Sequence, residues 1–138
     1  MGSYIVLAAD QARARLFKAD KREGELVEIT GLANPEARLR EQDLVSDASG
    51  GNPHDIGNHD SAHQHVAEVF AKEVGKALDQ AAQAHKPDRI YVLASPSFLG
   101  LLRPQWSAAL KGRIAQELAK DVSRMPPDQI RSHLPELL

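Results

Sequence analysis

The chain has 138 residues, of which 42% are hydrophobic and 26% charged, a composition typical of one globular domain with a sizeable core. Its net charge of -2 gives no general attraction to nucleic acid or to an anionic membrane, so any such contact has to be local. The absence of cysteine excludes disulfides, thiolate metal sites and cysteine nucleophiles.

Three short strands are predicted at the N-terminal end. Tyr4–Ala9 is a continuous apolar run, Arg13–Ala19 alternates apolar and basic residues, and Leu26–Ile29 has the looser alternation of a half-exposed strand. The connections between these strands are too short for a crossover helix. The sequence therefore predicts an antiparallel meander.

The regular pattern fails between Asn34 and Asp60. Residues 45–60 are rich in glycine, asparagine and aspartate, and we expect a long flexible loop there. Such a connection inside a compact domain is more often functional than decorative. The candidate functional residues of this loop are Gly50, Gly51, Asn52 and His54.

A long helix and a central strand are predicted next. Ser61 and Gln64 match a capping box, which places the start of a helix at Ser61 and its end near Lys86. Ile90–Ala94 has the pattern of a strand buried on both faces. Ser95 as N-cap and Pro96 at the first helical position then predict a short helix, whose free N–H groups at Ser97 and Phe98 could face a ligand.

The remaining pattern predicts a second long helix, a short edge strand and a last helix. Their expected limits are 107–120, 121–125 and 126–134. Strands and helices in this order indicate an α/β fold, with a mixed sheet, an N-terminal three-strand antiparallel meander and flanking helices.

Histidines and acids crowd the span from residue 54 to residue 65, but not at an established zinc spacing, so a solvated polar loop is the favoured interpretation. Asp10 ends the first strand, where a nuclease that binds two metal ions could use it. Such chemistry needs several converging acids, and an aspartate that stabilises its own turn or pairs with Arg13 is favoured. A metal-assisted hydrolase that uses Asp10 and the loop histidines stays open; these histidines are His54, His59, His63 and His65.

Positive charge is unevenly distributed along the chain. No lysine or arginine occurs from Glu41 to Ala71, whereas basic residues gather before residue 23 and after residue 102. A surface that meets phosphate should be formed from those two groups, although solvated basic faces are common. The candidates for RNA or anion binding are Arg13, Arg15, Ser97, Arg103, Arg113 and Lys120.

Several segments that span nearly the whole chain form a combined pattern. They are Ala9-Asp10 with Arg13–Phe17, Arg38–Arg40 with Asp43–Asp47, Phe70–Val74, Ser97–Arg103 and Glu117–Asp121. Together these segments resemble the bacterial host attachment protein family, whose name refers to attachment of bacteria to host cells. Members of that family also look similar to the middle domain of archaeal and eukaryotic class 1 peptide release factors, which has a ribonuclease H-like mixed sheet.

The resemblance has implications for the loop and for the domain organisation. In the release factors a Gly-Gly-Gln loop precedes the long helix and enters the ribosomal peptidyl transferase centre. The matching place here holds Gly50-Gly51-Asn52, with asparagine instead of glutamine and no basic residue beside it. The resemblance implies one host-attachment, release-factor-like domain over residues 1–138.

The favoured function is therefore a non-enzymatic RNA- or ribosome-binding domain that requires no cofactor. We expect it in the cytoplasm, because the N-terminus has no signal-peptide pattern and no apolar run approaches a membrane span. A protein-interaction module acting in attachment stays open beside the metal-assisted hydrolase. The sequence does not determine the substrate, the partner or the oligomeric state.

Overall fold

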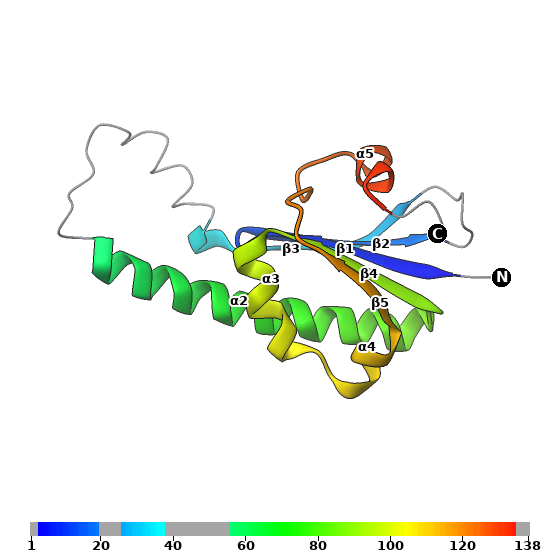
Figure 1. Ribbon diagram of the computed structural model, residues 1–138, viewed down its shortest axis with the longest axis horizontal. Helices are drawn as coiled ribbons and strands as arrows, with labels where there is room; N and C mark the ends of the chain where they lie inside the picture. Colours follow the sequence, from blue (N-terminus) through cyan, green and yellow to red (C-terminus); the bar gives the residue numbers. More distant parts are fainter. Residues whose placement is uncertain (1–2, 20–25, 38–55, 135–138) are drawn as a thin grey trace.

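The computed structural model describes residues 3–19, 26–37 and 56–134, and in the long helix it describes side chains from His65 onward. A mixed sheet separates two layers, with α2, α3 and α4 on one side and α5 on the other (Figure 1). In chain order the elements are β1 (Tyr4–Ala9), β2 (Arg13–Ala19), β3 (Val27–Ala33), α2 (Ile56–His85), β4 (Arg89–Ala94), α3 (Pro96–Leu102), the 3-10 turn η2 (Arg103–Gln105), α4 (Ala108–Arg113), β5 (Ile114–Leu118) and α5 (Pro127–Ser132).

The five strands lie in the order β3-β2-β1-β4-β5. β1, β2 and β3 pair antiparallel, so the predicted meander is confirmed. β4 pairs parallel with β1, and β5 pairs parallel with β4. α2 connects β3 to β4 and brings the chain back to the end of the sheet where β1 begins. β4 therefore starts at that end and pairs parallel with β1. The predicted α/β class with a mixed sheet is confirmed.

The larger core lies between the sheet and α2. β1 is buried along its whole length and β4 from Ile90 onward, as expected for strands covered on both faces. The rings of Phe70 on α2 and Phe98 on α3 lie 5.8 Å apart in this core. Its other large members are Ile5, Leu7, Leu16, Val74, Leu78, Ile90, Val92, Leu99, Leu102, Trp106 and Leu110.

A smaller core lies on the opposite face, beneath the C-terminal segment. There the Tyr4 and Tyr91 rings meet edge to face, with centroids 6.0 Å apart. Among the described residues, the side chains that cover the strands on this face come mainly from residues 122–134. The cluster contains Tyr4, Val6, Ala8, Phe17, Ala19, Leu26, Tyr91, Leu93, Val122, Ile130 and Leu134.

The long helix begins earlier than predicted. α2 starts at Ile56 and not at Ser61, so the predicted capping box lies inside the helix and residues 56–60 of the expected loop are helical. Once a helix is nucleated, each added residue costs little, which lets it extend through poor helix formers such as Gly57 and Asn58. The rest of the expected loop, residues 45–55, lies outside the described residues.

The C-terminal third differs most from the prediction. The helix expected over 107–120 ends at Arg113, where β5 begins, and residues 121–125 form a turn rather than the expected edge strand. Ile114 and Leu118 fit a helical spacing as well as a strand, and pairing with β4 decides for the strand. Gly112, in the last turn of α4, is the residue in the sequence that could have indicated the end of this helix.

The remaining elements agree with the prediction within a few residues. β3 runs on to Ala33, beyond the predicted end at Ile29. Ser95 occupies the N-cap of α3 and Pro96 its first position, as predicted, but the Ser95 side chain makes no capping hydrogen bond. The last helix is shorter than expected, from Pro127 to Ser132.

Close packing of α2 against η2 is sensitive to one methyl group. A Cβ atom at Gly75 would lie 2.9 Å from Gln105 Cβ, whereas one at Gly100 in α3 would have nothing within 4 Å. Overpacking of this kind costs about 1–3 kcal/mol, more than the roughly 1 kcal/mol of helix propensity that alanine adds. We therefore expect Gly75→Ala to lower the free energy of unfolding and Gly100→Ala to raise it, both measured by urea denaturation. Equal effects at the two positions would contradict the close contact.

Tyr4 gives the fold a dependence on alkaline pH. Burial raises the pKa of its phenol above the ordinary value, an effect that the nearby Arg131 charge partly offsets. Since the unfolded chain ionises first, at a pKa of about 10, stability should fall as the pH rises from there through the folded pKa. Urea denaturation between about pH 9 and pH 11 should show a shallower loss for Tyr4→Phe than for the wild type. The same slope in both proteins would contradict the assignment to Tyr4.

Candidate functional site

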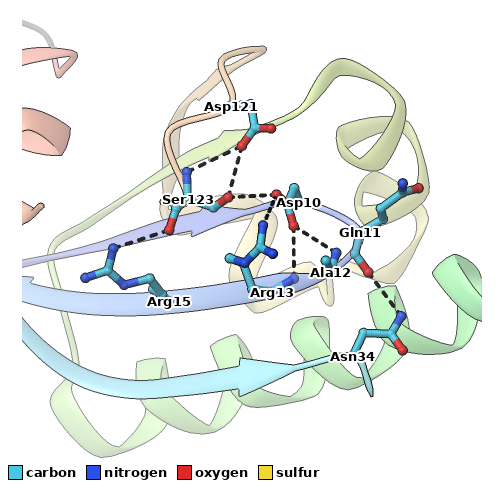
Figure 2. A network of polar contacts seen from close by, with 8 residues as sticks. All are labelled: Asp10, Gln11, Ala12, Arg13, Arg15, Asn34, Asp121 and Ser123. Atoms are coloured by element: carbon cyan, nitrogen blue, oxygen red, sulfur yellow. Dashed lines mark hydrogen bonds and ion pairs between the residues drawn. The ribbon is translucent and has the colours of Figure 1, made fainter. Parts of the chain in front are cut away.

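A polar network lies at the carboxyl edge of the sheet (Figure 2). Asp10 directly follows β1, and Ser95 directly follows β4, with its backbone N–H donating to Ala9 O at 3.2 Å. The segment after β5 brings Asp121 and Ser123 to the same edge. Ligands of open α/β sheets are usually bound outside the carboxyl ends of the strands, so this edge is the first place to seek a site.

The Asp10 carboxylate is the centre of this network, and the residue is only 7% exposed. Its Oδ1 accepts hydrogen bonds from the backbone N–H groups of Ala12 and Arg13, at 2.8 and 2.9 Å. Its Oδ2 accepts from Arg13 Nη1 at 2.8 Å and from Ser123 Oγ at 2.9 Å. The prediction of an aspartate that stabilises its own turn and pairs with Arg13 is confirmed. Four donors use the acceptor capacity that a metal ion would need.

Ser123 links two distant parts of the chain. Its side chain is fully buried, and its Oγ lies 2.9 Å from Asp10 Oδ2 and 3.0 Å from Asp121 Oδ1. One hydroxyl hydrogen can be donated to only one of these carboxylates at a time. Sequence reasoning missed Ser123 and Asp121, because no local pattern relates them to a residue more than a hundred positions earlier.

Arg15 fastens the C-terminal segment to the sheet. Its Nη1 donates to the carbonyl oxygens of Ser123 and Met125, at 3.2 and 2.6 Å. Its Nε and Nη2 donate to Glu28 Oε1 on β3, at 3.1 and 2.9 Å, and the guanidinium lies 4.9 Å from the centre of the Phe17 ring. Each guanidinium nitrogen therefore has an internal acceptor, so Arg15 is mainly a structural link.

Asn34 secures the same edge from β3. Its backbone N–H donates to Ala12 O at 2.9 Å, and its Nδ2 donates to Gln11 O at 3.0 Å. These bonds hold the β1–β2 turn in place from the side opposite to Ser123 (Figure 2).

The candidate anion-binding residues are not gathered on one surface. Arg13 and Arg15 lie on β2, where Arg13 pairs with Asp10 and Arg15 contacts the C-terminal segment, whereas Arg103 Nε donates to Glu117 Oε1 on β5 at 3.0 Å. β1 and β4 separate β2 from β5 in the sheet. Arg113 donates to Pro87 O at 2.8 Å, near the start of β4. The last two candidates, Ser97 and Lys120, are exposed.

The loop candidates Gly50, Gly51, Asn52 and His54 lie outside the described residues, as do the side chains of His59 and His63. His65 is described and exposed. Among the described residues, no group of three or more histidine, cysteine, aspartate or glutamate side chains could hold a metal ion.

A second polar feature lies beside β5, where a cleft of about 440 Å³ opens. Glu117 is held on its wall by Arg103 at 3.0 Å and by the indole N–H of Trp106, which donates to Glu117 Oε2 at 2.7 Å. The lining residues are Arg103, Trp106, Lys111, Ile114, Ala115, Gln116 and Glu117.

Comparison with known families gives a result that covers most of the chain. Residues 5–134 match the model of a family described as protein required for attachment to host cells. The chain belongs to the host attachment family. The resemblance seen in the sequence is thereby confirmed at the family level. Two contacts join segments on which it was based: Arg103 meets Glu117, and Ser123 connects Asp10 with Asp121.

The solved structures similar to this chain include two of the Ppx/GppA enzyme of Aquifex aeolicus. The type II variant of that phosphatase has a TM-score of 0.48 and 13% identity with this host attachment family chain, covering 86% of this chain and 35% of the enzyme. The second structure has a TM-score of 0.46 and 12% identity, covering 85% and 36%. The chain thus spans about a third of the length of these enzymes. No curated protein matches the chain.

No helix in the described part of the chain is both long enough and apolar enough for a membrane span.

The Ser123 hydroxyl should contribute measurably to stability. Ser123→Ala leaves the buried Asp10 carboxylate with one donor fewer, which typically costs about 1–3 kcal/mol. The matched control is Ser132→Ala at an exposed serine whose Oγ donates to Gln129 O at 2.6 Å, where we expect a change of no more than about 0.5 kcal/mol. Urea denaturation measures both, and a Ser123→Ala protein as stable as the control would show that the network is not needed to hold the fold.

Proposed function

We propose that this host attachment family protein is a non-enzymatic RNA- or ribosome-binding domain of the cytoplasm. The proposal includes a ribonuclease H-like fold related to the middle domain of archaeal and eukaryotic class 1 peptide release factors. It also assigns the contact with the ribosome to the Gly50-Gly51-Asn52 segment, which precedes α2 in the chain.

The reach of α2 is the observation that supports this proposal most. A helix of 30 residues is about 45 Å long, whereas β1 with 6 residues spans about 20 Å. α2 therefore cannot lie on the sheet over its whole length, and its N-terminal turns extend past the carboxyl edge of the sheet (Figure 1). Asn52 precedes Ile56, the first residue of α2, by only four positions. A protruding helix end of this kind suits insertion into a large partner.

The charge distribution suggests how affinity would be supplied. The segment from Glu41 to Ala71 has no cation, so attraction to phosphate would come from the body of the domain. Lys72 and Lys76 are exposed on the part of α2 that packs on the body of the domain, and Lys120 is exposed after β5 at the carboxyl edge of the sheet. Contacts of this type are long-range and strongly dependent on salt.

The metal-assisted hydrolase has less support, because its central residue Asp10 already accepts four hydrogen bonds. A protein-interaction role in attachment is compatible with the family name.

Co-sedimentation with purified bacterial ribosomes tests the proposal. We expect binding at about 50 mM salt that weakens steeply toward about 200 mM. The double variant Lys72→Glu/Lys76→Glu should weaken binding and lower the log–log salt slope by about 2, since each lysine that contacts phosphate contributes about one unit. Arg89→Glu/Lys111→Glu, a double reversal of exposed residues near the starts of β4 and β5, is the matched control.

A further double variant addresses the loop. Gly50→Val/Gly51→Val should reduce binding about tenfold or more, because added side chains prevent close backbone approach, a loss equivalent to about 1.4 kcal/mol. Two results would overturn the proposal. In one, ribosomes never retain the protein at low salt. In the other, they retain the Lys72→Glu/Lys76→Glu and Gly50→Val/Gly51→Val variants as well as the wild type.

A further inference from the structure

β5 is an edge strand with one side unpaired in the described part of the chain. It is the last strand of the sheet order, and one of its edges pairs with β4. Within residues 3–19, 26–37 and 56–134 no strand pairs with its other edge. Ala115 and Gln116 are exposed on it. An edge of this kind presents backbone N–H and C=O groups to which another extended chain can add.

The cleft beside β5 gives this edge a chemical preference. Trp106 and Ile114 supply apolar surface, and Arg103, Lys111 and Glu117 supply charge. Glu117 is already satisfied by Arg103 and by the Trp106 indole, so Lys111 leaves one positive charge in excess. A cleft of this size can take one or two side chains, and its charge favours a carboxylate.

We propose that the outer edge of β5 and this cleft bind an extended acidic peptide segment of a partner protein. The peptide would add as a sixth strand beside β5 through backbone hydrogen bonds. An aspartate or glutamate side chain would enter the cleft beside Lys111 and Arg103. Strand addition of this type takes its affinity from the backbone and its specificity from side-chain pockets. The site uses other residues than the proposed ribosome contact, which rests on the N-terminal end of α2 and on Lys72, Lys76 and Lys120.

The geometry favours a peptide over nucleic acid at this place. Single-stranded nucleic acid stacks its bases on exposed aromatic faces, but Trp106 is only 7% exposed. Pairing of β5 with β5 of a second copy is disfavoured, because Lys111 and Arg113 precede the strand and Lys120 follows it, so that like charges would meet. The same cations can also act merely as protection of the edge against self-association.

Binding of short synthetic peptides tests this proposal. The probe is a capped hexapeptide of alternating glutamate and valine. The comparison probes are the same peptide with lysine for glutamate and an oligouridylate of similar length, all followed by fluorescence anisotropy. We expect the glutamate peptide to bind at least tenfold more tightly than the lysine peptide. Lys111→Gln should reduce its affinity about tenfold, equivalent to about 1.4 kcal/mol, whereas Lys72→Gln on α2 should leave it unchanged.

N-methylation of the peptide separates strand addition from simple charge attraction. Methylating alternate amides removes the donors of one peptide edge and keeps the charge, so one of the two alternating patterns should abolish binding. Three results would overturn the proposal: no binding of the glutamate peptide, binding that Lys111→Gln and both methylation patterns leave intact, or displacement of the peptide by oligouridylate. Dimerisation that Lys111→Gln strengthens and the peptide does not reverse would assign the cations to edge protection alone.

Discussion

The hydrogen bond between Ser123 and Asp10 joins the N-terminal and C-terminal parts of this chain. The position of the C-terminal segment, which covers the face of the sheet opposite to α2, depends on it. Asp10 Oδ1 shapes the β1–β2 turn by accepting hydrogen bonds from two backbone N–H groups. Its Oδ2 accepts hydrogen bonds from the side chains of Arg13 and Ser123. Arg15 adds two hydrogen bonds to the carbonyl groups of the same C-terminal segment. Directional polar contacts thus determine where residues 121–125 lie on the sheet.

This polar attachment matters because the apolar contact on that face is small. Val122, Ile130 and Leu134 are the buried apolar residues in the described part of the C-terminal segment, whereas the opposite face is covered by α2, α3, Trp106 and Leu110. Burial of three side chains contributes only a few kcal/mol, which is comparable with the ordering entropy of a short segment. Hydrogen bonds in a buried setting then fix a position that hydrophobic contact alone would leave loosely defined.

Local sequence patterns correctly predicted those elements whose own apolar pattern fits only one type of secondary structure. β1, β2 and β4 have continuous or alternating apolar residues, and their limits agree with the prediction within one residue. The prediction for the region after Ser107 was wrong because Ile114 and Leu118 fit both a helical and a strand periodicity. Only pairing with the neighbouring β4 decides between the two. The predicted start of α2 was wrong for a related reason. Helix propagation is cooperative, whereas a capping box expresses only a local preference.

In the candidate site, too, contacts between sequence neighbours were predictable and contacts between distant residues were not. That Asp10 pairs with Arg13 was predictable, because they are three positions apart in a turn. The role of Arg15 was not, because its acceptors lie on β3 and in the C-terminal segment. A list of basic residues therefore overestimates the charge available to a ligand, since internal carbonyl and carboxylate groups accept from several of them.

Trp106 has a consequence for experiments on this protein. It is the single tryptophan of the chain, and its indole N–H donates to Glu117 on the wall of the cleft beside β5. Its emission therefore comes from one known position, and a change in the polarity or charge of that position alters the spectrum directly. The molecule carries a built-in optical reporter of events at this edge of the sheet, which requires neither a label nor a substitution.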